Sequence, residues 1–210
     1  MSAADWSAVV LSLQVAAMAT AISLPIGTVL AFVLARKRFV GQFLIENLLQ
    51  FPLVLPPVVT GYALLIVLPH TIAFTWGAAV LASAIVGFPL LVQTARVAFE
   101  GVDPELEAAA RVDGARPWDV FRRITLPLAA RGVAAGSVLH FARALGEFGA
   151  TIVVAGNIPG RTQTLPLALF SRLNQVGGEA PALRLALVAV GLAALSLMVY
   201  ALLVRRLPKG

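Results

Sequence analysis

The sequence predicts an all-α polytopic membrane protein with about five transmembrane helices, an external N-terminus and a cytoplasmic C-terminus. Of its 210 residues, 60% are hydrophobic and 12% are charged, whereas soluble domains have about 45–50% and about 25%. The mean hydropathy is +0.91. Because a domain of this size cannot hide so much apolar surface, we expect the excess to face lipid.

Five stretches are long enough for membrane spans, since a bilayer core about 30 Å thick needs about 20 apolar residues of helix. Proline residues interrupt the second stretch and should bend or break its helix. The sequence leaves open whether this is a kink packed against a neighbour or an unwound segment lining a path. The stretches are roughly Val9–Ala35, Leu48–Leu68, Ile72–Ala95, Leu128–Ala155 and Leu185–Val204.

The basic residues define the expected topology. No basic residue precedes the first span, so we expect a retained anchor rather than a secretory signal. With Arg36-Lys37-Arg38 in the cytoplasm, the inside segments hold 12 of the 16 Lys and Arg residues, in agreement with the positive-inside rule. This topology explains the basic composition without nucleic-acid binding. The inside set is Arg36, Lys37, Arg38, Arg96, Arg111, Arg116, Arg122, Arg123, Arg131, Arg205, Arg206 and Lys209, and the outside set is Arg161, Arg172 and Arg184.

The cytoplasmic loop at residues 100–127, EGVDPELEAAARVDGARPWDVFRRITLP, predicts two helices joined by a turn. Asp103 and Pro104 suit the cap and first position of a helix, and two acidic residues follow near its positive end. Gly114 then allows a turn, and Pro117 opens a second short helix. The exposed apolar groups of this loop need a cover, either the membrane interface or a partner protein. We assign the whole chain, 1–210, to a single transmembrane domain that contains this loop.

The loop resembles the EAA loop of bacterial ABC importer permeases, in which an acidic residue, two alanines and a glycine precede nine residues and Ile-x-Leu-Pro. Here Gly114 is followed by nine residues and then Ile124-Thr125-Leu126-Pro127. The resemblance implies a type I ABC importer permease fold and a loop that docks on separate cytoplasmic ATPase subunits. The implied coupling residues are Glu107, Ala108, Ala109, Ala110, Arg111, Gly114, Pro117, Ile124, Leu126 and Pro127.

The acidic residue departs from the family pattern. Counting back from Gly114, Ala108 stands at the usual glutamate position, and Glu107 is displaced by one residue. On a helix, a shift of one residue turns the side chain by about 100°. The sequence therefore leaves open whether Glu107 makes the contact that is usual in the family.

The fourth span carries the polar residues His140, Arg143 and Glu147. Spacings of three and four residues put them on one helix face. Charges at this depth usually face a bundle interior, pair with each other and mark a pathway. The sequence leaves open a structural ion pair and a polar strip beside a substrate route. Two His residues and scattered carboxylates predict no metal site, and we find no catalytic set and no cofactor motif.

The stretch Ala142–Phe170, ARALGEFGATIVVAGNIPGRTQTLPLALF, resembles the permease subunits of molybdate importers. Leu53–Tyr62 and Phe88–Val92 add to this resemblance, and sulfate and thiosulfate permeases share the Leu-Gly-Glu-Phe/Tyr-Gly core. The resemblance to molybdate permeases implies an extracytoplasmic binding protein that selects the oxyanion. The candidates for contact with that protein or for an outer gate are Asn157, Pro159, Gly160, Thr162 and Thr164.

The partners follow from what one chain offers. A path forms more easily between two copies, so we expect a homodimer in the inner membrane. The sequence has no G-x-x-x-x-G-K-[ST] phosphate loop, so ATP hydrolysis needs a partner.

Residues 165–173 are too short to span and predict an interfacial or re-entrant helix. The alternatives are a sulfate, thiosulfate or tungstate permease and an ion-coupled secondary transporter.

Overall fold

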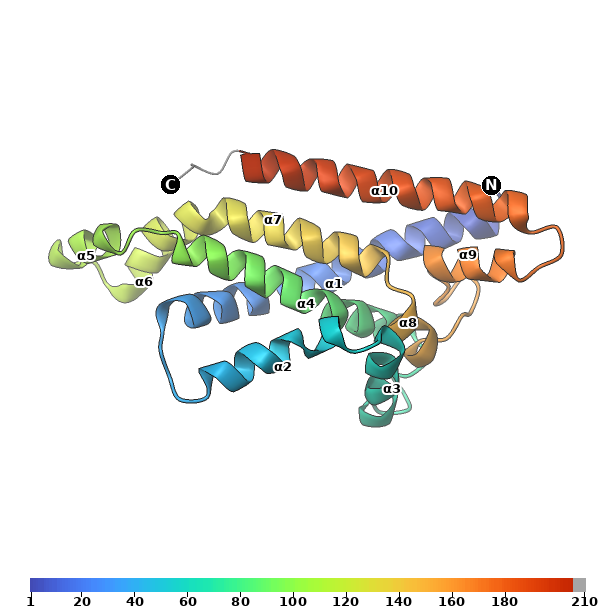
Figure 1. Ribbon diagram of the computed structural model, residues 1–210, viewed down its shortest axis with the longest axis horizontal. Helices are drawn as coiled ribbons and strands as arrows, with labels where there is room; N and C mark the ends of the chain where they lie inside the picture. The colour runs from blue at the N-terminus through green and yellow to red at the C-terminus, as the bar shows by residue number, and fades with distance from the viewer. Residues whose placement is uncertain (206–210) are drawn as a thin grey trace.

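The computed structural model describes residues 1–205, and within them every regular element is a helix (Figure 1). Four helices are long: α1 (Ala3–Arg36), α4 (Trp76–Glu100), α7 (Leu126–Leu145) and α10 (Glu179–Arg205). The shorter elements are α2 (Gln42–Val54), α3 (Pro57–Val67), α5 (Pro104–Val112), α6 (Pro117–Val120), the π-helical turn η1 (Phe121–Thr125), α8 (Gly149–Val154) and α9 (Leu165–Leu173).

Four long helices run along the long axis of the described molecule, and a bent pair of shorter helices stands where the sequence predicts the second span (Figure 1). Each of the four long passages, α1, α4, the stretch 117–145 and α10, is long and apolar enough to cross a membrane by itself. The pair α2 and α3 is apolar enough to count as a fifth span when taken together, and the axes of these two helices differ by 112°. The second predicted span is thus broken rather than kinked, because Pro56 and Pro57 have no backbone N–H to continue the ladder.

The fourth predicted span also differs from the expectation. We expected one helix to reach Ala155, but α7 ends at Leu145 and α8 begins at Gly149. The backbone N–H of Ala150 donates to the Glu147 carboxylate at 2.8 Å. A side chain therefore satisfies a donor at the start of a new helix, so the chain turns instead of continuing.

The helices α1, α4 and α7 pack along one another and form the core of the bundle. Small residues make this close approach possible. A Cβ atom added at Gly136 on α7 would lie 3.0 Å from the backbone oxygen of Leu91 on α4. By contrast, α10 lies on the outside against α7 and α9 and has few buried residues (Figure 1). We expect its outer face to contact lipid.

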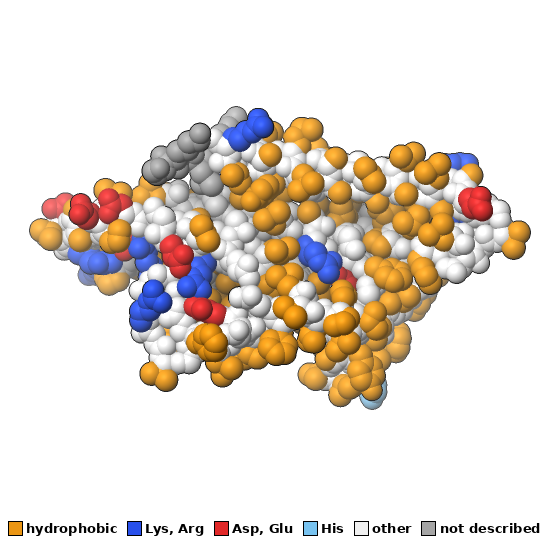
Figure 2. Space-filling view, in the orientation of Figure 1, with side chains coloured by type: hydrophobic (Ala, Val, Ile, Leu, Met, Phe, Trp, Pro, Cys, Tyr) orange, Lys and Arg blue, Asp and Glu red, His pale blue; other side chains and the backbone are white. Residues whose placement is uncertain are grey.

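The two ends of the molecule differ in charge. One end, which we call the loop end, contains α5, α6 and the last turns of α1, α4 and α10 (Figure 1). Charged side chains gather there, whereas the middle of the visible face is largely apolar (Figure 2). The loop end carries the segments that we predict to be cytoplasmic. Arg206 and Lys209 of that predicted set lie outside the described residues.

The two broken passages meet at α3 and α8, which pack against each other. A Cβ atom on Gly61 would lie 2.6 Å from the backbone oxygen of Ala150, and one on Gly149 would lie 2.9 Å from Cβ of Pro57. Only glycine permits such close backbone approach at these two positions. The breaks therefore form one contiguous unit away from the loop end.

Candidate functional site

The predicted helix–turn–helix is present at the loop end. The Asp103 carboxylate accepts the backbone N–H of Glu105 at 2.9 Å and caps α5. Gly114 follows α5 with φ at +85°, a left-handed conformation that favours glycine. Pro117 starts α6, which continues through η1 into α7. The loop is therefore continuous with the start of α7.

Glu107 faces the interior of the chain. Its Oε1 accepts a hydrogen bond from Thr125 Oγ1 at 2.7 Å and lies 3.0 Å from Nη2 of Arg36. Its Oε2 lies 3.2 Å from Nη2 of Arg111. Only 8% of the Glu107 side chain is exposed, compared with 57% of that of Arg111. This carboxylate thereby ties α5 to the end of α1 and to η1.

A different face of the loop is exposed on the surface of the chain. Val112 is 87% exposed and Trp118 is 66% exposed. Ala108, Ala109 and Pro117 are also exposed, whereas Ala110 and Ile124 are half-buried. Large apolar groups in such positions mark an interaction surface. The predicted coupling residues thus divide into an inward anchor at Glu107 and an exposed apolar surface around the turn.

Arg143 and Glu147 form the predicted ion pair. Nη1 of Arg143 lies 2.7 Å from Oε2 of Glu147. The Glu147 side chain is 1% exposed and the Arg143 side chain is 29% exposed. Because Glu147 also accepts the N–H of Ala150, it joins the end of α7 to α8. The pair lies at the helix break, and its cationic partner reaches the surface of the chain.

His140 lies apart from this pair. It is fully buried, its Nε2 donates to the backbone oxygen of Ala84 at 3.2 Å, and its Nδ1 lies 3.0 Å from Thr20 Oγ1. Gly87 gives it room, because a Cβ there would lie 3.0 Å from Cδ2 of the imidazole. The structure therefore gives His140 contacts that connect α7 with α1 and α4. Of the three polar residues on this predicted face, Arg143 and Glu147 pair with each other, and His140 has partners on α1 and α4.

The five residues predicted for outer contacts lie in the connection between α8 and α9. Asn157 donates to Ser171 Oγ at 2.8 Å, and Thr162 Oγ1 accepts the N–H of Ile158 at 3.1 Å. Thr162 and Thr164 are buried. Pro159 and Gly160 are exposed at the tip of the loop. These last two are the positions of the set that a partner can reach in this conformation.

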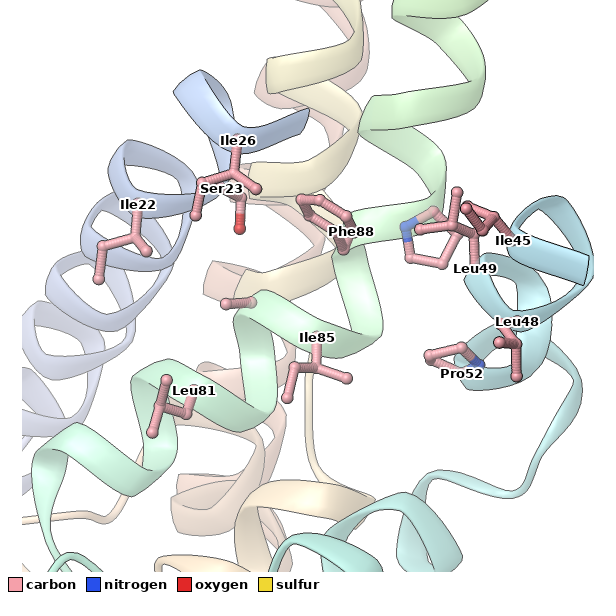
Figure 3. A pocket seen from close by; sticks show the side chains of 12 residues that line it. Ile22, Ser23, Ile26, Ile45, Leu48, Leu49, Pro52, Leu81, Ile85 and Phe88 are labelled. Carbon is pink, nitrogen blue, oxygen red and sulfur yellow. The ribbon is translucent and has the colours of Figure 1, made fainter. Parts of the chain in front are cut away.

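A cavity of about 440 Å³ lies between α1, α2 and α4 (Figure 3). Its lining side chains are hydrocarbon except for the hydroxyl of Ser23. An oxyanion needs several N–H or O–H donors or positive charge, so this cavity does not suit one. The lining residues are Ile22, Ser23, Ile26, Ile45, Leu48, Leu49, Pro52, Leu81, Ala84, Ile85, Phe88 and Pro89. Among residues 1–205, no group of His, Cys, Asp or Glu side chains is arranged to hold a metal ion.

Three important contacts were not predicted from the sequence. Arg36 reaches Glu107 across 71 positions of sequence, and Arg172 at the end of α9 binds Asp5 at 2.8 Å near the start of α1. Arg96 on α4 binds Glu46 on α2 at 2.8 Å. From the sequence, Arg36 and Arg96 were predicted only to lie on the cytoplasmic side. Their partners depend on the helix packing, which the sequence pattern does not fix.

Residues 23–209 match the sequence family described as "Binding-protein-dependent transport system inner membrane component". The chain belongs to this family. An inner membrane component with this set of apolar helices is a multi-pass membrane protein. The family description names a binding protein on which transport by such a component depends.

Relatives of this inner membrane component extend along almost the whole chain. "Molybdenum transport system permease protein ModB" of Escherichia coli (strain K12) is 47% identical over 209 residues, with 93% of this chain and 91% of the relative covered. The protein of the same description from Haemophilus influenzae is 46% identical over 217 residues, with 97% and 95% covered.

Two solved structures share the fold of this inner membrane component. One is described as an amino acid ABC transporter with histidines, and the alignment covers 97% of this chain and 94% of that one at a TM-score of 0.70. The other is an inward-facing MetNI methionine ABC transporter, with both chains fully covered at a TM-score of 0.70. Both are 18% identical to this chain. The expected ABC importer permease fold is thus confirmed.

Proposed function

We propose that this chain is the membrane-spanning permease subunit of an ATP-driven importer for molybdate. The observation that carries the proposal is the 47% identity to a molybdenum transport permease along 93% of the chain. The broken passages and the helix–turn–helix at the loop end support the same role. Two copies form the path, cytoplasmic ATPase subunits provide the energy, and an extracytoplasmic protein selects the oxyanion.

The loop end is the part through which the ATPase acts. The exposed surface around Val112 and the turn at Gly114 docks on the ATPase, and α5 moves with it. Glu107 carries this movement to Arg36 on α1 and to Thr125 at the start of α7, since both contacts are 3.0 Å or shorter. Both helices belong to the packed core, so a shift at the loop reorients the bundle. In this arrangement the loop end is cytoplasmic and the N-terminus is external.

Arg143 borders the route of the anion. A partly exposed guanidinium in the apolar part of a membrane protein is costly unless it faces protein or water. Facing the path between two copies, it contributes positive potential, while its pairing with Glu147 prevents tight trapping of the dianion. Selectivity then resides mainly in the binding protein. That protein docks at the end opposite the loop end, where Pro159 and Gly160 are exposed.

Transport by the purified components tests this proposal. The permease is reconstituted into liposomes with its ATPase and binding protein, and uptake of radioactive molybdate is followed with and without ATP. We expect ATP-dependent uptake that excess unlabelled molybdate abolishes and that an equal concentration of sulfate leaves in place. Uptake that prefers sulfate would contradict the choice of molybdate. Uptake that an ion gradient drives without the ATPase would contradict the whole assignment.

A further inference from the structure

A second cavity, of about 630 Å³, opens beside the last turns of α1 at the loop end. Its walls come from α1, α5, α6 and η1, and it is unlike the hydrocarbon cavity between α1, α2 and α4. Part of its lining is apolar, including Val29, Phe32 and Trp118. Another part is basic, with Arg36, Lys37 and Arg111. The cavity thus combines two kinds of surface that one small anion would not need.

The two kinds of surface are separated along α1. Val29 and Arg36 are seven residues apart, which corresponds to about 10 Å of helix. Val29 is 61% exposed in the apolar part of α1, whereas Lys37 is exposed just beyond the end of the helix. Because α1 crosses the membrane, the apolar wall lies at the depth of acyl chains. The basic residues lie where the helix reaches the membrane surface.

The charge of the cavity is positive. Three basic side chains line it, and Glu107 is its single acidic lining residue. Glu107 contacts Arg36 and Arg111, and Lys37 is exposed. The net charge of the four charged lining residues is therefore positive. Aromatic and basic side chains at a membrane surface are typical contacts of lipid headgroups. Trp118 stacks on Phe121 with ring centroids 5.5 Å apart and supplies such an aromatic wall.

We propose that this cavity binds an anionic phospholipid. The phosphate lies at Lys37 and Arg111, and one acyl chain follows the wall formed by Val29 and Phe32. The ATPase does not fit this place equally well, because a cytoplasmic protein does not reach an apolar wall at acyl-chain depth. A free oxyanion would leave that wall without a partner. The bound lipid would brace α5 against α1 beside the contact of Glu107 with Arg36.

Lipid binding to the purified permease with its ATPase tests the proposal. The probe is fluorescent phosphatidylglycerol in detergent micelles, with fluorescent phosphatidylcholine as the comparison. We expect tighter binding of phosphatidylglycerol, and we expect Lys37→Gln to weaken it about fivefold, the usual factor for one basic residue at an anionic surface. Arg38→Gln is the matched control, because Arg38 carries the same charge one residue later and does not line the cavity. Val29→Trp should also weaken binding by filling the apolar wall.

Four results would overturn the proposal. The two lipids bind equally well, or Lys37→Gln has no larger effect than Arg38→Gln. Inorganic phosphate at millimolar concentration displaces the lipid completely, which would identify a site for free anions. The lipid binds the permease alone but not the permease in complex with its ATPase, which would identify the cavity as part of the ATPase contact. Since the assay measures no transport, these results are independent of the test of molybdate uptake.

Discussion

In the proposed mechanism, the contact between Glu107 and Arg36 is the structural link that transfers energy into the membrane helices. Its strength follows from burial, since the side chains are 8% and 16% exposed and their charged atoms are 3.0 Å apart. Exposed ion pairs contribute below about 1 kcal/mol, and breaking a fully buried pair costs about 3–5 kcal/mol. Because Gln in place of either residue retains part of the hydrogen bonding, we expect a coupling free energy of about 2 kcal/mol.

A double-mutant cycle of Glu107→Gln and Arg36→Gln measures this coupling by equilibrium unfolding of the solubilised permease. The matched control is the pair Arg96 and Glu100 at the same end, which is 2.7 Å apart but 27% and 44% exposed. We expect a coupling free energy below about 1 kcal/mol for that pair. In transport assays, Glu107→Gln should lower the molybdate taken up per ATP hydrolysed. A coupling equal to that of the control pair, with transport efficiency unchanged, would refute the reasoning.

Three further substitutions test other parts of the account. Gly114→Val should abolish uptake but leave membrane insertion intact, because φ of +85° strains a β-branched residue. Gly114→Asn is the control and should retain uptake, because asparagine tolerates this conformation. Equal uptake by the two variants would contradict the role of the turn. Gly61→Ala should lower the melting temperature, because its Cβ would lie 2.6 Å from Ala150 O, while Gly191→Ala in open space should not; similar melting temperatures would argue against the close packing. Arg143→Gln combined with Glu147→Gln should remove most uptake from a folded dimer, and unaffected uptake would reduce the pair to a structural role.

Local sequence signals predicted the loop and most helices well. The Asp103 cap, Gly114 and Pro117 act within a few residues of chain, so their sequence pattern specifies the turn directly. The short helix at Leu165–Leu173 has the predicted bounds. Hydrophobic length predicted the four long helices and the apolar pair α2 and α3, because the thickness of the bilayer sets the length of a span.

The breaks and the charge partners were less predictable because they depend on tertiary contacts. Hydropathy continues through Gly146 and Phe148, so only the capping role of Glu147 marks the end of α7. Likewise, helical spacing places His140 beside Arg143, but packing against Ala84 on α4 gives it other partners. The one-residue displacement of Glu107 set it apart from the family pattern, but only the fold shows that Arg36 is its partner.

Site-specific photocrosslinking at Val112 tests most directly whether the loop end couples a separate ATPase to the membrane helices. Val112 is 87% exposed at the end of α5, and Val29, 61% exposed on α1, provides a control at acyl-chain depth. In membranes that contain the whole importer, we predict that a probe at position 112 captures the ATPase and a probe at position 29 captures phospholipid. Capture of phospholipid alone at position 112 would contradict the account.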